Sequence, residues 1–382
     1  MEVLMDIGRF FINPVLYISL LAAILIGYFR VKKERSLFRT RIVWGGREFN
    51  DLLKAGLLYA IVLSILFCAV GLVVPLEWLV ALTLISVLVI ISGVFQLASF
   101  VYLATAAAGL GWLLNHYGWT IPFGLFEYSG YPLAWNWLLP VALITGAMMF
   151  AEGRLIAAHG AKAASPRIQK TSRGGTGVYY KTKRLWLIPL FLAVPGDLVE
   201  SYLPYWPQFP IGNSSFSFIL FPAIIGFQSR ARKTLPVYLY PKLGKKVWML
   251  GIAMILIALL SYVWAPSALI ALLIGTAARA SISISYAINE NKGNHALAPQ
   301  STGVMIVDVL ADSPAEKMGL LRGEIIRKVN GLTVTNEAEL YEAIQVNAAH
   351  CRLEVVDHNM EMRLRQQVIF RHDHYRLGLI VI

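Results

Sequence analysis

The sequence has few charged residues for its length. Asp, Glu, Lys and Arg make up 15% of its 382 residues, whereas 57% are hydrophobic. Soluble globular domains carry about 25% charged residues, so most of this chain is too apolar for a soluble protein. Acidic residues are especially scarce, because 22 Asp and Glu stand against 34 Lys and Arg. This composition predicts an integral membrane protein.

Cysteine is also nearly absent. The two cysteines, Cys68 and Cys351, lie in an apolar run and near the C-terminus, so a disulfide framework is excluded. A small-residue cleavage site is missing after the first apolar run, Phe10–Phe29. We therefore expect this run to be a retained membrane span and not a removed signal.

The apolar region lacks the motifs of intramembrane enzymes. A zinc protease needs two histidines one helical turn apart with a glutamate between them, but this region has only His116 and His159. A serine enzyme needs a glycine-framed serine or a serine with a base in reach, and Ser217 has neither. We therefore predict no enzymatic activity and no cofactor.

Long apolar runs are abundant. Spans of about 20 apolar residues cross the hydrocarbon core as helices, and nine runs qualify as candidates. They are Phe10–Phe29, Ala55–Val74, Leu76–Ile91, Phe95–Leu114, Leu133–Ala151, Leu185–Leu203, Ile211–Phe227, Val247–Val263 and Pro266–Ile288. The third and fourth share one stretch, so two helices or one re-entrant element are both open.

Basic residues lie in three blocks between these runs. The segments 30–54, 154–184 and 230–246 hold 22 of the 34 Lys and Arg, and the alternate connections hold none. The positive-inside rule then predicts an outside N-terminus and cytoplasmic basic segments and C-terminus. Blocks of this kind favour anionic lipid as a partner and do not indicate nucleic acid. The Gly-, Ser- and Lys-rich stretch from Gly160 to Arg184 is expected to be a flexible cytoplasmic linker.

Charges within the spans allow two interpretations. Asp197, Glu200 and Arg279 fall in or beside apolar runs. An ion pair of Arg279 with Asp197 or Glu200 would be structural, whereas separate placement around a water-filled cavity would indicate transport. A small-solute transporter is therefore kept as an alternative function.

The last 80 residues have the composition of a soluble domain. Strands are expected at Gly303–Leu310, Glu324–Val329, Cys351–Val356 and Met362–Phe370. Ser313-Pro314 and Thr335 or Asn336 are typical helix starts, and Asn330-Gly331 is a tight-turn dipeptide. The run "SPAEKMGLLRGEIIRKVNG" in this order of elements resembles a bacterial PDZ domain.

The PDZ resemblance implies a site that binds an extended peptide, usually a C-terminus, as an added strand. The carboxylate-binding loop matches Arg376-Leu377-Gly378-Leu379, with Arg376 in place of the family's first glycine. Because this match ends the chain, the domain resembles a circularly permuted PDZ domain. The implied peptide-binding residues are Arg376, Leu377, Gly378, Leu379, Ile380, Asn336, Leu340, Ala343 and Ile344. The apolar members of this set fit the core of a small domain equally well.

His372, Asp373 and His374 are the one cluster that suggests a metal. Two histidines with one residue between them can chelate a divalent ion, but further ligands cannot be named. We favour solvated loop residues or peptide contacts, and predict no metal site.

The N-terminal segment "FFINPVLYISLLAAILIGYFRVKKERSLFRTRI" resembles the start of the MinJ family, polytopic division-topology proteins of Gram-positive rods that also end in a PDZ domain. The resemblance implies a non-enzymatic adaptor that links a DivIVA-like polar scaffold to a MinD-like ATPase at septa and poles. The expected architecture is a multi-pass α-helical membrane domain (1–290), a linker (291–300) and a cytoplasmic α+β PDZ-like domain (301–382). A regulator of a PDZ-containing intramembrane protease is a further alternative.

Overall fold

Helices make up most of the first 290 residues. The computed structural model describes residues 10–123, 126–128, 135–170, 174–196, 208–211, 214–347, 350–368 and 377–382. Its helices in this part are α2 (Pro14–Phe38), α3 (Arg47–Lys54), α4 (Leu57–Val70), α5 (Leu76–Ser92), α6 (Phe100–Tyr117), α7 (Trp135–His159), α9 (Pro236–Leu259) and α10 (Ser267–Asn291). Five helical segments are long and apolar enough to cross a membrane, namely α2, α3 with α4, α7, α9 with the turn after it, and α10.

Two of the nine predicted helical spans are strands. Leu185–Leu203 and Ile211–Phe227 fall largely in β4 (Thr176–Pro195) and β6 (Ser214–Ala231), which form an antiparallel hairpin, so the prediction of nine helical spans is wrong. Pro189 and Pro222 face each other in its register. A strand tolerates proline where the missing N–H is not needed by the ladder. Proline alone does not exclude a helix here, since Pro140 and Pro241 lie inside α7 and α9. The other seven predictions correspond to helices, and the third and fourth are separate helices, α5 and α6.

The predicted flexible linker is mostly ordered secondary structure. β3 (Ser165–Lys170) pairs with the start of β4, and β5 (Phe209–Ile211) with β6, giving the sheet order β3-β4-β6-β5. A 3-10 turn (Ala161–Ala163) precedes β3. The expectation of a flexible segment from Gly160 to Arg184 is therefore wrong for its described residues, because this segment pairs with itself as a hairpin.

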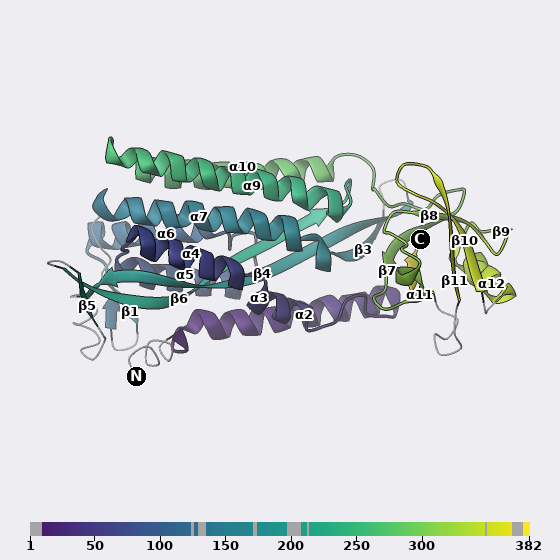
Figure 1. Ribbon diagram of the computed structural model, residues 1–382, viewed down its shortest axis with the longest axis horizontal. Helices are drawn as coiled ribbons and strands as arrows, with labels where there is room; N and C mark the ends of the chain where they lie inside the picture. The colour runs from purple at the N-terminus through teal and green to yellow at the C-terminus, as the bar shows by residue number, and fades with distance from the viewer. Residues whose placement is uncertain are drawn as a thin grey trace.

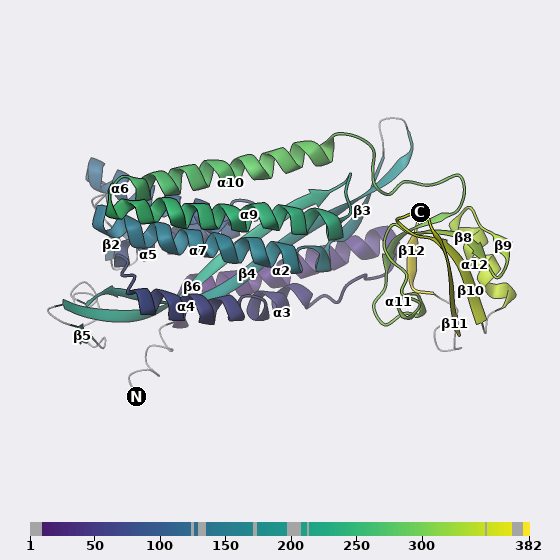
Figure 2. The same ribbon diagram turned by 45° about the horizontal axis from the view of Figure 1, so that its top comes forward.

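Neighbouring backbone contacts both edges of the β4–β6 hairpin. Figures 1 and 2 show the hairpin between a layer of α7, α9 and α10 and the helix α2. Open strand edges are not tolerated in hydrocarbon, since each unpaired group costs several kcal/mol. The N–H of Val74 donates to the carbonyl of Ala193 (3.0 Å), and the N–H of Gly226 donates to the carbonyl of Ala98 (2.7 Å). A connection beside α4 and one beside α6 thus each form a backbone hydrogen bond with an edge of the hairpin.

The C-terminal part is a small α+β domain. Its elements are β7 (Val304–Val309), α11 (Pro314–Lys317), β8 (Ile325–Val329), β9 (Leu332–Thr333), α12 (Glu337–Val346), β10 (His350–Val356), β11 (Met362–Val368) and β12 (Leu379–Val381). The sheet order is β11-β10-β8-β7-β12, with β9 beside β8. Ser313 caps α11 and Asn336 caps α12, as predicted. Asn330 and Gly331 have φ values of 52° and 87°, which confirms the tight turn.

Two apolar cores meet across β7. Val304 and Ile306 belong to the core of the C-terminal domain. Met305 and Val307, which point the other way, belong to the large core of the helices and the hairpin. Successive side chains of a strand alternate between faces, so one sheet face of the C-terminal domain packs on the membrane part.

The helices α7 and α9 approach closely at glycines. A Cβ on Gly153 would lie 2.3 Å from the nitrogen of Trp248 and 2.6 Å from the carbonyl of Gly244. Small residues allow such backbone contact between membrane helices. We expect Gly153→Val to lower the free energy of unfolding by about 1–3 kcal/mol or more, because the helices must separate.

Thermal unfolding of the purified protein in detergent measures this loss. Gly109→Val in α6 is the matched control, since a Cβ there meets nothing within 4 Å. Equal melting temperatures for the two variants would contradict close packing at Gly153.

Candidate functional site

The last strand, β12, lies at an edge of the C-terminal sheet. It pairs with β7, and none of the other described strands pairs with it. The segment before it is anchored, because the N–H of Leu310 donates to the carbonyl of Gly378 (2.8 Å) and the N–H of Ala315 to that of Leu377 (2.9 Å). Gly378 has φ of 77°, and a Cβ there would lie 2.2 Å from the Cβ of Ser313. Only glycine suits this position.

The predicted peptide-binding residues divide between three environments. Leu377, Leu379, Leu340, Ala343 and Ile344 are buried together in the core of the C-terminal domain. Ile380 is buried on the other face, in the large core, and Asn336 is exposed at the cap of α12. Arg376 lies outside the described residues. The structure thus brings the loop, β12 and α12 into one small domain, and the peptide-binding roles stay predictions.

A buried tyrosine joins the C-terminal domain to the hairpin. The Tyr180 hydroxyl, from β4, donates to the carbonyl of Val307 in β7. The guanidinium of Arg322 lies 5.5 Å from the centre of the Tyr180 ring and pairs with Asp308 at 2.7 Å. Burial raises the pKa of Tyr180, so its hydroxyl stays protonated and donates at neutral pH.

The segment between α10 and β7 is also held in place. The N–H of Val178 in β4 donates to the carbonyl of Leu297 (2.9 Å), and the N–H of Ala296 donates to that of Arg232 (2.8 Å). The buried carboxylate of Glu290 accepts three backbone N–H groups, from residues 232, 233 and 234, at 2.8–3.0 Å. These bonds fix the segment that leads from α10 to the C-terminal domain.

The three basic segments gather at the end that carries the C-terminal domain. Figure 1 shows α2 and α7 ending there, β4 and α9 beginning there, and β6 ending there. Nearby carboxylates are already paired, because Glu34 and Glu48 bind Arg30 (3.0 and 2.5 Å) and Asp51 binds Arg184 (2.7 Å). Among the described residues of these basic segments, no Lys side chain forms an ion pair with a carboxylate.

The intramembrane arginine pairs with a carboxylate that the sequence analysis did not name. Arg279 binds Glu152 of α7 at 2.8 and 3.0 Å, and both side chains are buried. Its expected partners, Asp197 and Glu200, lie outside the described residues. Glu152 was missed because it directly follows the predicted end of the fifth span, Ala151.

Metal-binding groups are absent from the described part of the chain. Among those residues, no group of three or more His, Cys, Asp or Glu side chains could hold an ion. The sequence cluster at His372, Asp373 and His374 lies outside them.

Comparison with known proteins assigns the family. Residues 305–357 match the PDZ domain family. The chain is 30% identical over 381 residues to the cell division topological determinant MinJ of Bacillus subtilis (strain 168), covering 100% of this chain and 95% of that protein. The chain belongs to the MinJ family.

Two other relatives differ in how much of the chain they match. The probable cell division topological determinant MinJ of Lacticaseibacillus paracasei is 28% identical over 229 residues, which cover 57% of this chain and 58% of that protein. The serine protease HTRA1 of Xenopus laevis is 50% identical over 48 residues, 12% of this chain and 10% of the protease. The likeness to the protease is therefore local, whereas the likeness to MinJ proteins extends through the helices.

Proposed function

We propose that this MinJ-family chain is a non-catalytic membrane adaptor in the selection of the division site. The observation that supports this function is the full-length similarity to a relative named as a cell division topological determinant. The edge strand β12 suits it, because an extended peptide or a C-terminus can add to such an edge through backbone hydrogen bonds.

We assign a separate role to each of the two parts of the chain. Residues 1–290 anchor the protein in the bacterial cell membrane, residues 291–300 connect, and the circularly permuted PDZ-like domain at 301–382 binds a division protein in the cytoplasm. The basic segments attract acidic cytoplasmic partners and anionic lipids. The partners we propose are a DivIVA-like scaffold and a MinD-like ATPase, met at septa and poles.

Fluorescence microscopy of cells tests this function. A fusion of the full chain is expected to gather at septa and poles, and deletion of residues 301–382 is expected to spread it evenly and to disturb cell length. Uniform fluorescence of the full-length fusion in cells with normal septa would refute the proposal.

Thiol labelling tests the proposed orientation. The experiment starts from a Cys68→Ala protein, because Cys68 is exposed near the end of α4. The remaining native thiol should not react, because Cys351 is buried and burial raises its pKa to about 11. Val263, 91% exposed after α9, and Met362, 63% exposed in β11, are suited to cysteine substitution. In intact cells, a membrane-impermeant maleimide should label Val263→Cys only.

Permeabilised cells provide the control for this experiment. Met362→Cys should become reactive there, and the Cys68→Ala protein without an added cysteine should remain unlabelled. Labelling of Met362→Cys in intact cells would place the C-terminal domain outside and exclude cytosolic partners.

A further inference from the structure

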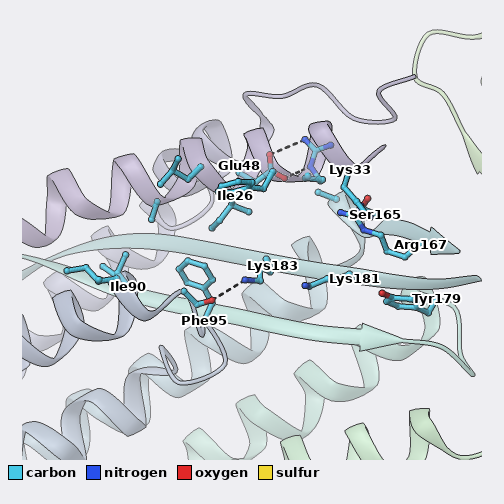
Figure 3. A pocket seen from close by; sticks show the side chains of 17 residues that line it. Ile26, Lys33, Glu48, Ile90, Phe95, Ser165, Arg167, Tyr179, Lys181 and Lys183 are labelled. Carbon is cyan, nitrogen blue, oxygen red and sulfur yellow. Dashed lines mark hydrogen bonds and ion pairs between the residues drawn. The ribbon is translucent and has the colours of Figure 1, made fainter. Parts of the chain in front are cut away.

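A cleft of about 590 Å³ opens at the basic end of the membrane part. One wall consists of apolar side chains of α2 and of the end of α5, and the other of strands β3 and β4 (Figure 3). Neither the PDZ resemblance nor the division role assigns anything to this cleft.

The apolar wall continues onto the surface of the spanning helices. Leu25 and Phe29 of α2 are 43% and 60% exposed, and Ile91 of α5 is 69% exposed. In a membrane these side chains contact lipid tails. The Nζ of Lys183 donates to the carbonyl of Gly93 (3.0 Å), directly after α5 ends at Ser92. The basic wall therefore begins where an apolar helix ends, the level at which lipid headgroups lie.

The opposite wall holds cations without anions. Arg167, Lys181 and Lys183 line it, and Lys33 lines the cleft from α2. In the described part of the chain none of these four pairs with a carboxylate. The lining contains one carboxylate, that of Glu48, and Arg30 already binds both of its oxygens (2.5 and 3.1 Å). The buried Nη1 atom of Arg167 has no hydrogen-bond partner among the residues that the structure describes.

The pKa of Lys181 also indicates repulsion between these cations. Burial, and then the nearby charges of Lys183, Arg230 and Arg167, lower the pKa of Lys181. A bound anion would counter the repulsion between these cations.

We propose that this cleft binds one anionic phospholipid. Its phosphate lies between Arg167, Lys181 and Lys183, and an acyl chain follows the apolar wall formed by α2 and α5. Basic pockets beside membrane helices bind anionic headgroups in this manner. An acidic peptide would satisfy the cations but would leave the apolar wall open to the bilayer. This site specifies the anionic-lipid contact proposed above and does not depend on the division partners.

Native mass spectrometry of the full-length protein in detergent tests the site. Dioleoyl phosphatidylglycerol, dioleoyl phosphatidylcholine and inorganic phosphate are offered separately at equal concentrations. We expect one tightly retained phosphatidylglycerol, with the other two retained about tenfold less. The double variant Arg167→Gln/Lys181→Gln should lose about tenfold in phosphatidylglycerol retention.

The matched control removes two charges from the same end but outside the cleft. Lys242 and Lys245 are exposed on α9, and Lys242→Gln/Lys245→Gln should retain the lipid as the unsubstituted protein does. Equal losses of phosphatidylglycerol retention in both double variants would overturn the proposed site, because they would indicate unspecific electrostatic attraction. Equal retention of both lipids, or retention of phosphate alone, by the unsubstituted protein would overturn the lipid site even if the variants do not fold.

Microscopy separates this outcome from the adaptor function. If the lipid site fails, the full-length fusion should still gather at septa; if the adaptor function fails, the unsubstituted protein should still retain phosphatidylglycerol.

Discussion

Glu152→Leu is expected to lower the free energy of unfolding by about 3–5 kcal/mol. The guanidinium of Arg279 is 3% exposed and would lose both contacts to the Glu152 carboxylate, at 2.8 and 3.0 Å. The hydroxyl of Ser99, which donates to the same carboxylate (2.6 Å), would also lose its partner. Removal of one member of a buried ion pair costs this much because the remaining charge has no water to solvate it. Thermal unfolding of the purified protein measures the loss.

Removing both charges provides the control. Glu152→Leu/Arg279→Met should recover most of the stability, since two apolar side chains can replace a buried pair at little cost. The double variant also tests the transporter alternative. If the pair is only structural, replacing both charges by apolar residues should leave septal localisation unchanged. A double variant as unstable as Glu152→Leu would contradict a simple ion pair, and solute flux that depends on Arg279 would favour transport.

The C-terminal domain was predictable because its signals are local. Ser313, Asn336 and the Asn330-Gly331 turn act within four residues of their own positions. Strands and caps therefore followed from the sequence almost residue by residue. The placement of Ile380 was not predictable in this way, because its partner surface lies in a distant part of the chain.

The membrane part shows the limit of apolar length as a signal. A continuous run of about 20 apolar residues has no periodicity that distinguishes a buried strand from a helix. Proline does not mark the strands either, because Pro140 and Pro241 lie inside the helices α7 and α9, just as Pro189 and Pro222 lie inside the strands. Their pairing across the hairpin is a contact of high sequence separation that one chain read alone does not reveal.

The docking of the two parts depends on single residues that no motif marks. Tyr180 reads as one aromatic residue in a basic segment, yet its hydroxyl reaches the backbone of β7. Glu152 reads as the end of a span, yet it binds a residue 127 positions away. Such contacts are specified by the whole fold and not by local pattern.

Val381→Pro is expected to abolish septal enrichment of the full-length fusion while the protein remains folded. Ile382 and Met305 exchange both backbone hydrogen bonds (3.0 and 3.2 Å), so the backbone groups of Ile382 point toward β7. Alternation along an antiparallel strand then turns the N–H of Val381 toward the free edge. Proline removes this donor and obstructs an incoming strand, so an added peptide should lose at least about tenfold in affinity. Fluorescence at septa relative to the lateral membrane measures the result.

Val381→Ala is the matched control, because it shortens the same side chain but keeps the N–H. It should retain septal enrichment, and in both variants the thiol of Cys351, buried in the domain core, should resist alkylation if the domain is folded. Normal septal enrichment of a folded Val381→Pro variant would show that recognition does not use the edge of β12. The basic segments would then be the remaining contact for division partners, since they gather at the same end of the molecule. Loss of enrichment in both variants with Cys351 protected would instead assign recognition to the Val381 side chain, and the backbone mechanism of strand addition would be wrong.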